Sequence, residues 1–208
     1  MNQVVAGALV DHAKAETLVT RKTLDGFSSI SELRSMMEVM PWVLKGDLED
    51  FRRGSASVKL GQLCALLAAS ELMEWSPDET ALIGWNGSGC SENNTAYWED
   101  YAINGRELGR SGLFVATLPT TPACEVAITL GIHGPVFYLQ TPALTEALFE
   151  EVDSVFLRGN IRHVIVLEIN SDSACALFLE RGDFEIKTRI QTETLSQLFF
   201  LLKERGKP

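Results

Sequence analysis

Short apolar runs alternate with longer helical stripes along most of the chain. Five of these runs contain several β-forming residues and end at polar or turn residues, which predicts buried strands at residues 4–10, 80–85, 136–139, 163–169 and 174–179. A sixth stretch, residues 184–190, alternates apolar and polar side chains as a half-exposed strand does.

Apolar residues at helical spacing predict the helices that lie between these strands. In residues 57–75 they cover nearly the whole circumference, so this helix is expected to be buried on most sides. Residues 122–130 begin with proline and stop at Gly131, and residues 144–156 are amphipathic. A final helix is expected over residues 194–203.

Residues 11–53 form the least regular part of the chain. There we predict only a helix over residues 32–40, which Ser31 caps and Pro41 stops. No repeat or Pro/Gly/Ser-rich linker divides the sequence, so one domain is expected over residues 1–208. Strands that alternate with helices of this length predict an α/β domain whose sheet carries helices on both faces.

Composition and charge narrow the functional classes. The 208 residues are 46% hydrophobic and carry a formal net charge of −10, which fits a globular domain. A negative protein repels a phosphate backbone, so nucleic acid is not expected as a ligand. The apolar runs are shorter than the roughly 18 residues that span a bilayer, and the N-terminus does not resemble a secretory signal. We therefore expect no membrane span and a cytoplasmic location.

The cysteines are the main candidates for chemistry. All four are tens of residues apart, and no histidine stands at ligand spacing from them, so no metal site is expected. The loop at residues 84–89 lacks the ending of a P-loop and the spacing of a dinucleotide fingerprint, so no cofactor is expected. Buried structural roles are the simplest interpretation of the cysteines. Cys90, directly after this loop, and Cys124, near a predicted helix N-terminus, are the alternatives as reactive thiols.

Residues 118–135 read Leu-Pro-Thr-Thr-Pro-Ala-Cys-Glu-Val-Ala-Ile-Thr-Leu-Gly-Ile-His-Gly-Pro. This stretch resembles the Leu-Pro-Asn, Ala-Gly-x-Ile-Ala-Ile-x-Leu-Gly-x-x-Gly-Pro segment of β-ketoacyl synthases, the condensing enzymes of fatty-acid and polyketide synthesis. The flanking strands and helices follow in the family's order, and residues 174–180 resemble its Ala-x-Ala-Leu-Val-Leu-Glu strand. The resemblance implies one half of a thiolase-like layered α/β fold, with a mixed five-stranded sheet and helices on both faces.

Two departures from this family imply a loss of catalysis. The family's Gly-Pro is followed after five residues by Thr-Ala-Cys-Ala, whose Cys carries the acyl group. Here the same spacing reaches Thr141-Pro142-Ala143-Leu144, which puts Ala143 at the position of the nucleophile. A methyl group cannot form a thioester. The family's second half, with two histidines that assist decarboxylation, is also expected to be missing from these 208 residues.

A ketosynthase relative without a nucleophile resembles the chain length factors, which pair with an active ketosynthase and shape the acyl tunnel. The resemblance places the strand Val136-Phe137-Tyr138-Leu139-Gln140 at an edge of the sheet. Because an uncharged edge strand of β-forming residues favours pairing, we expect antiparallel contact with another subunit there. Tyr138 and Gln140 are candidate contact residues; the alternative is that the strand only closes the chain's own sheet.

Three functional hypotheses follow. The first is a non-catalytic subunit that forms a heterodimer with an active condensing enzyme. The second is a homodimer that binds an acyl group or another small apolar ligand, and the third is an acyl-transfer enzyme that uses Cys90 or Cys124. A chain of net charge −10 steers acidic acyl carrier proteins poorly unless Arg52, Arg53 and Lys59 form a local basic patch. We therefore expect the partner to bind the carrier protein.

Overall fold

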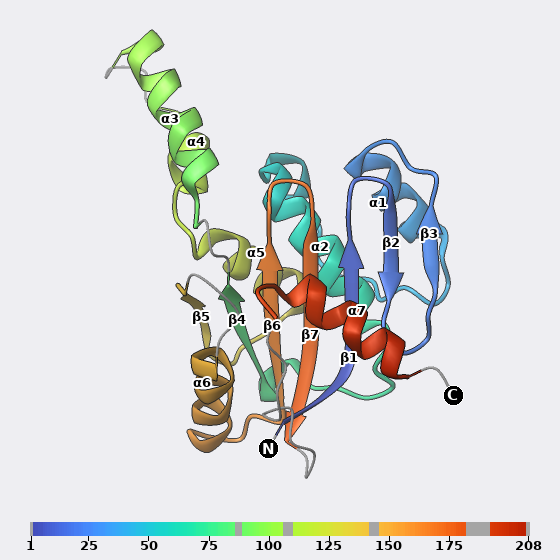
Figure 1. Ribbon diagram of the computed structural model, residues 1–208. Helices are drawn as coiled ribbons and strands as arrows, with labels where there is room; N and C mark the ends of the chain where they lie inside the picture. The colour runs from blue at the N-terminus through green and yellow to red at the C-terminus, as the bar shows by residue number, and fades with distance from the viewer. Residues whose placement is uncertain (1, 86–88, 106–109, 142–145, 182–191, 207–208) are drawn as a thin grey trace.

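The computed structural model describes residues 2–85, 89–105, 110–141, 146–181 and 192–206 (Figure 1). One mixed sheet has the strand order β3-β2-β1-β7-β6-β4-β5. Its strands are β1 (Asn2–Val10), β2 (Lys14–Thr17), β3 (Thr23–Asp25), β4 (Thr80–Trp85), β5 (Val136–Leu139), β6 (His163–Ile169) and β7 (Ala174–Arg181). Strand β4 runs parallel to both β5 and β6, and the other neighbours are antiparallel.

The sheet has seven strands, so the expectation of five was wrong. The additional strands β2 and β3 read Lys-Ala-Glu-Thr and Thr-Leu-Asp, which are too short and too polar to stand out as apolar runs. They form because β2 pairs with the long strand β1 and then carries β3 at its other edge. Tertiary pairing, not local preference, decides such strands. The strand predicted at residues 184–190 lies outside the described residues.

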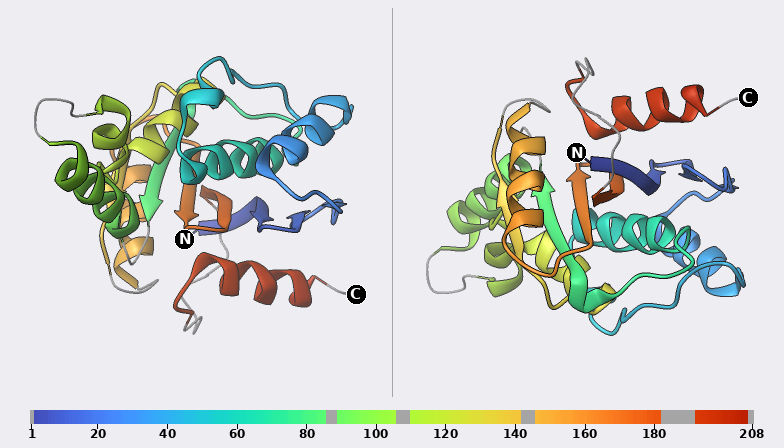
Figure 2. Two further views of the ribbon diagram at one scale, coloured as in Figure 1. Left: turned by 90° about the horizontal axis from the view of Figure 1, so that it is seen from above. Right: turned by 90° about the horizontal axis from the view of Figure 1, so that it is seen from below.

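Helices cover both faces of the sheet, as expected (Figure 2). One face carries α1 (Ile30–Val39), α2 (Ala56–Ala69) and α5 (Thr121–Leu130), and the other carries α6 (Glu146–Leu157) and α7 (Leu195–Arg205). The short 3-10 helices η1 (Phe51–Arg53) and η2 (Pro77–Glu79) flank α2 and β4 along the chain. No helix in the described segments is long and apolar enough to cross a membrane.

Strand β6 shows how the sheet separates two cores. All seven of its residues are buried. Ile165 and Leu167 belong to the cluster that contains α2, whereas Val164 and Val166 belong to the cluster that contains α6 and α7. A strand covered on both faces needs apolar residues at consecutive positions, which is the pattern that its sequence shows.

Helix α2 is buried around nearly its whole circumference, as predicted, but it ends at Ala69 and not at Trp75. Beyond Ser70, Glu71 bonds back to β1 and to the residues that follow β2. Its carboxylate accepts hydrogen bonds from the backbone N–H groups of Gly7, Leu18, Val19 and Thr20, at 2.6 to 3.2 Å. The buried helix is thereby fixed to the strand pair β1 and β2.

Helix α1 begins at Ile30, two residues earlier than predicted. Its cap is Ser29, not Ser31, and the Ser29 hydroxyl accepts from the Glu32 N–H at 3.2 Å. The Glu32 carboxylate in turn accepts from the Ser28 N–H and hydroxyl, and these bonds lower the pKa of Glu32. The predicted boundaries of β4 and β5 are confirmed, and α5 ends at Gly131 in the left-handed conformation, with φ at 66°.

Candidate functional site

A cavity of about 200 Å³ lies at the carboxyl ends of the parallel strands β4, β5 and β6. Tyr138 and Ile169 line it from the strands, and the first residues of α2, α5 and α3 (Ser91–Asn104) close it from above the sheet. The chain leaves β4 toward β5 through α5 on one face, and leaves β5 toward β6 through α6 on the other. Ligand sites of open α/β sheets form at such points, where successive crossovers lie on opposite faces.

Cys90 lies in this cavity at the N-cap of α3 and is half-buried. Burial raises the pKa of its thiol, and the hydrogen bond with the Asn93 side chain offsets this only in part. The thiol is therefore protonated near neutral pH, which is the opposite of what a nucleophilic cysteine requires. Cys90, one of the two predicted reactive thiols, lines the cavity, but its surroundings raise the pKa of the thiol.

Tyr138 is the second polar group of the cavity that matters chemically. Burial raises the pKa of its hydroxyl, and the nearby Cys90 raises it further. A Cβ atom placed on Gly89 would lie 3.9 Å from the Tyr138 hydroxyl, so the loop passes close to this ring. The two groups therefore offer hydrogen-bond donors, and the Glu92 carboxylate also lies in the cavity lining.

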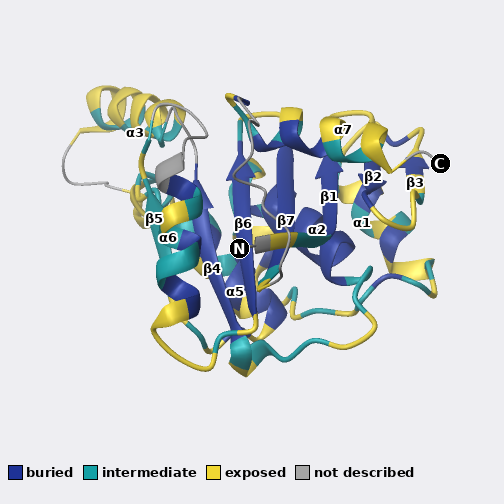
Figure 3. Ribbon diagram, turned by 60° about the horizontal axis from the view of Figure 1, so that its bottom comes forward, coloured by how far each residue is buried: buried dark blue, intermediate teal, exposed yellow. Residues whose placement is uncertain are grey.

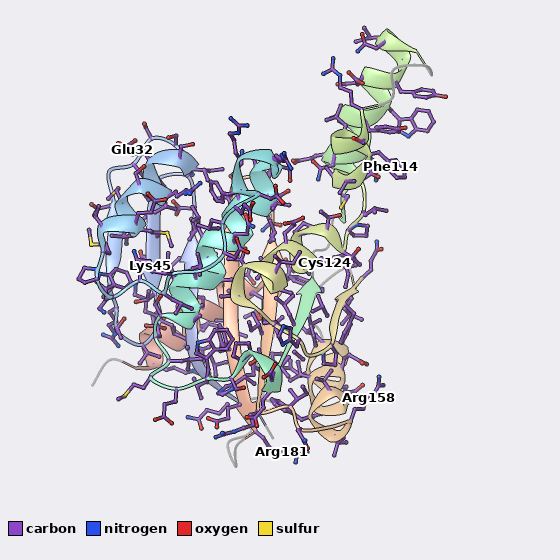
Figure 4. The ribbon with its side chains drawn as sticks, turned by 180° about the vertical axis from the view of Figure 1, so that it is seen from behind. Glu32, Lys45, Phe114, Cys124, Arg158 and Arg181 are labelled. Carbon is purple, nitrogen blue, oxygen red and sulfur yellow. The ribbon has the colours of Figure 1, made fainter. Side chains whose placement is uncertain are left out.

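The other cysteines lie away from the cavity lining. Cys124 is exposed on α5 (Figure 4), although its neighbours Pro122 and Ala123 line the cavity. Cys64 and Cys175 are fully buried, and burial raises the pKa of Cys64 to about 12 and that of Cys175 well above its ordinary value. The Cys64 sulfur lies 3.3 Å from the Ala8 carbonyl oxygen and 3.2 Å from that of Ala174, so its single proton can be donated to either. Cys64 and Cys175 are therefore buried as the simplest interpretation of the cysteines expected.

The histidines stay apart from the cavity as well. His12 is exposed between β1 and β2, and His133 pairs through Nδ1 with the Asp78 carboxylate at 2.6 Å. His163 begins β6 and is buried, and its burial lowers its pKa. Over the described segments, no group of three or more His, Cys, Asp and Glu side chains could hold a metal ion.

Strand β5 is an edge strand, as expected. It pairs with β4 on one side, and no other described strand pairs with it. Its four residues are all half-buried: Phe137 and Leu139 pack toward α6, while Val136 packs toward the opposite core. Tyr138 turns into the cavity, whereas Gln140 is exposed. The two predicted contact residues therefore lie in different surroundings.

Arg34 and Lys59 lie over the buried ring of Phe51, and Arg52 and Arg53 follow Phe51 in η1. The Arg34 guanidinium lies 4.8 Å and the Lys59 ammonium 5.8 Å from the ring centroid. Arg52 and Arg53 are exposed beside them in η1, and Arg53 pairs with Asp50 at 3.1 Å. A small basic patch thus exists on this acidic chain, although acidic neighbours partly neutralise it.

Sequence reasoning missed the arm, which we define as α3 together with α4 (Ser111–Ala116). It projects beyond the carboxyl ends of β4 and β5 (Figure 1), and α3 contains no buried residue (Figure 3). Tyr97, Trp98 and Tyr101 from α3 and Phe114 from α4 form an aromatic cluster. Three aromatic residues within five positions were the signal available, but the polar residues around them concealed a helix.

No family model and no curated protein matches this sequence. Solved structures do match. A structure of the ketosynthase ApeO in complex with its chain length factor ApeC from Xenorhabdus doucetiae gives a TM-score of 0.63 at 13% identity, and the match covers 99% of this chain and 92% of that one. The ishigamide ketosynthase/chain length factor gives 0.58 at 12% identity, over 89% and 63%. The type II polyketide synthase complex AntDE:AntF gives 0.52 at 11% identity, over 99% and 64%.

The chain has the thiolase-like fold of these ketosynthase structures. It spans almost the full length of the first matched chain and less than two thirds of the other two. The stretch from Leu118 to Pro135, which carries the sequence resemblance, forms α5 and the approach to β5. Ala143, at the position of the family's nucleophile in that resemblance, lies outside the described residues.

Proposed function

We propose that this chain is a non-catalytic subunit of the chain-length-factor kind, which pairs with an active condensing enzyme of polyketide or fatty-acid synthesis. The observation that carries the proposal is the position of β5 as the last strand of the described sheet, in a sheet of the ketosynthase fold. Two of the matched structures are of a ketosynthase with its chain length factor. Ala143 at the expected nucleophile position and the protonated Cys90 thiol support a role without catalysis.

Strand β5 has the physical properties of a pairing edge. Its residues Val-Phe-Tyr-Leu carry no charge and no proline, the devices by which proteins protect an exposed edge. A strand added beside β5 would extend the sheet across the two subunits. Phe137 and Leu139 already lie on the core, so the added strand would need only its own backbone and a matching apolar face.

Net charge favours a different chain over a second copy as the partner. Two copies would each carry −10 and would repel one another, whereas a partner with a more basic surface would be attracted. The basic patch around Phe51 is small, so direct binding of an acidic acyl carrier protein would receive little steering from this chain. The partner subunit would then bind the carrier protein.

Affinity capture from native lysate, followed by the solution mass of the eluted complex, tests the proposal. A stoichiometric condensing enzyme is expected. The exposed Gln140 beside β5 offers a directed variant, because Gln140→Lys adds a charge at the pairing edge and should weaken the complex at least about tenfold. Asn160→Lys adds the same charge in an exposed loop and should leave it unchanged. A monomer or homodimer without an enzyme would reject the heterodimer.

Restoring the nucleophile tests the non-catalytic part of the proposal separately. Ala143→Cys alone should give no condensing activity, because none of the three histidines lines the cavity at the strand ends. The assay supplies an acyl and a malonyl carrier protein and measures the β-ketoacyl product. Product formation by the purified variant without any partner would overturn the inference that the catalytic histidines are missing.

The cavity favours a second candidate, a homodimer that binds a small acyl or other apolar ligand. Its volume of about 200 Å³ and its lining by Trp85, Tyr138 and Ile169 would suit a short apolar group. Native mass spectrometry of the protein as isolated separates the two: a dimer of this chain with a bound small molecule would favour the second candidate.

A further inference from the structure

A second cavity, of about 310 Å³, lies between α1, α2 and the loop at residues 43–49. We call it the α1–α2 cavity. Its walls come from one face of α1, from the middle of α2 and from this loop. The lining residues of the two helices are Arg34, Met37, Glu38, Leu63 and Leu66. Figure 4 marks the loop by Lys45, on the side of the body away from the arm. The α1–α2 cavity shares no lining residue with the cavity at the strand ends.

The inner wall of the α1–α2 cavity is apolar. Leu63, Leu66 and Met37 are each at most 3% exposed and belong to the hydrophobic core, and Val43 adds a buried side chain from the loop. Protein cores contain few voids larger than a water molecule. A space of this size beside core side chains therefore differs from ordinary packing. Ligand pockets are cavities of this kind, lined mostly by apolar side chains.

Hydrogen bonds hold the loop that shapes the cavity. The Leu44 N–H donates to the Ser70 hydroxyl at 2.8 Å, and the Asp47 N–H donates to the Thr129 carbonyl at 3.0 Å. Between these two bonds, a Cβ atom placed on Gly46 would lie only 2.7 Å from the Thr129 carbonyl oxygen. The loop is thereby tied to the ends of α2 and α5. The cavity is thus formed without a ligand, which lowers the cost of binding one.

The charged side chains of the lining balance one another. The Arg34 guanidinium pairs with the Glu38 carboxylate at 2.8 Å, and the Lys45 ammonium donates to the Glu38 backbone carbonyl at 2.6 Å. With Glu49, the lining holds two cations and two carboxylates. A charged ligand therefore gains no net attraction there and loses its hydration on entry. The lining favours an uncharged ligand.

We propose that the α1–α2 cavity binds an uncharged apolar small molecule. An apolar cavity of about 150 Å³ binds benzene, so a cavity of about 310 Å³ has room for a molecule of two fused rings. The inference goes beyond the proposed function and depends neither on β5 nor on the cavity at the strand ends. It gives a role to residues 34–49, which lie in the part of the chain where the sequence pattern predicted least.

Indole is the probe for the test, and isotope-labelled methionine methyl groups report where it binds. The chain has five methionines, so the spectrum is simple. As indole is added, the Met37 signal should shift to saturation, whereas that of Met73, which is 101% exposed, should stay in place. Indole-3-acetate carries a carboxylate on the same rings and should bind at least about tenfold more weakly, because burying its charge is costly.

Two results of this titration would overturn the proposal. If the Met37 signal does not move up to the solubility limit of indole, the cavity binds no such molecule. If indole-3-acetate binds as tightly as indole, the ligand is not of the uncharged class. Either result leaves the proposed function unchanged, because the test involves no condensing enzyme.

A matched pair of variants at Leu48 tests the position of the ligand. Leu48→Trp fills the cavity from the loop and should weaken indole binding at least about tenfold, whereas Leu48→Met keeps the side-chain volume and should bind as the wild type does. The urea midpoint of Leu48→Trp should equal or exceed that of the wild type, because the added ring occupies existing space. If indole binds Leu48→Trp as tightly as the wild type, it binds elsewhere and the inference is wrong. The Met37 titration uses the unchanged chain, so it tests the proposal even if Leu48→Trp is destabilised.

Discussion

Helices α2 and α3 have the same length of 14 residues and opposite surroundings. Eleven residues of α2 are buried between the sheet, α1 and α5, whereas α3 buries none. The body of the molecule therefore carries its stability, and the arm carries exposed aromatic surface. A change in α2 should act on folding more strongly than a change in α3.

The largest effect expected comes from the centre of α2. Leu63 is fully buried, and Leu63→Ala should lower the free energy of unfolding by about 2–5 kcal/mol through lost burial and an added cavity. Ile103→Ala in α3 removes a side chain that is 82% exposed and should change it by less than about 0.5 kcal/mol. Urea denaturation followed by circular dichroism measures both. Equal losses would show that the arm belongs to the cooperative body.

The next effect lies at the end of α2, where Glu71 bonds to the first hairpin. Glu71→Ala leaves the N–H groups of Gly7, Leu18, Val19 and Thr20 without their acceptor, and should cost about 2–3 kcal/mol of the free energy of unfolding. Glu74→Ala removes an exposed carboxylate three residues later and controls for charge. If the two variants unfold at the same urea concentration, Glu71 does not hold the hairpin as argued.

Glu71 also shows why sequence patterns reached some elements and not others. Consecutive apolar residues are needed where an element is covered on both sides. This pattern made β4, β6, β7 and α2 predictable from the sequence. Just beyond the end of α2, the Glu71 carboxylate accepts hydrogen bonds from residues 51 to 64 positions away. A local sequence pattern does not reveal such contacts, and the same holds for β2, which pairs with β1, and for β3, which pairs with β2.

The candidate site was predictable in part for the same reason. The order of strands in the resemblance placed β5 at an edge, and the Gly-rich loop led to Cys90 at the carboxyl end of β4. The raised pKa of Cys90 was not predictable, because its burial depends on the fold, which brings Tyr138 and Pro122 to the same cavity. The sequence analysis did not predict the arm, because α3 lacks the apolar stripe that predicts a packed helix.

A third and smaller effect concerns the buried carboxylate Glu168, which has no counterpart in the arm. Burial raises the pKa of Glu168, while hydrogen bonds from Asn170 and from the Leu195 and Ser196 N–H groups offset this in part. Because the folded protein binds this proton more tightly than the unfolded chain, its contribution to stability is present at low pH. It is lost as pH rises from the unfolded pKa near 4.5 through the higher folded value.

Glu168→Gln removes this titration and keeps an acceptor for the Leu195 N–H. The unfolding free energy of the wild type, relative to that of Glu168→Gln, should therefore fall as the pH rises above the ordinary pKa of 4.5. Glu204→Gln removes one exposed carboxylate from α7, the same helix that Glu168 caps, and its profile should follow the wild type. A difference between wild type and Glu168→Gln that is constant with pH would remove Glu168 as the titrating group.

The smallest perturbation uses the four thiols as reporters of the same contrast, without changing the sequence. At pH 7.5, iodoacetamide should label the exposed Cys124 first and the half-buried Cys90 more slowly, since burial raises the pKa of Cys90. Cys64, with a pKa of about 12, and Cys175 should react only when the body unfolds. Peptide mass spectrometry over time gives each rate. If Cys90 instead reacted fastest, its pKa would have to be lower than its buried surroundings imply. That result would support the hypothesis of an acyl-transfer enzyme that uses Cys90 as its nucleophile.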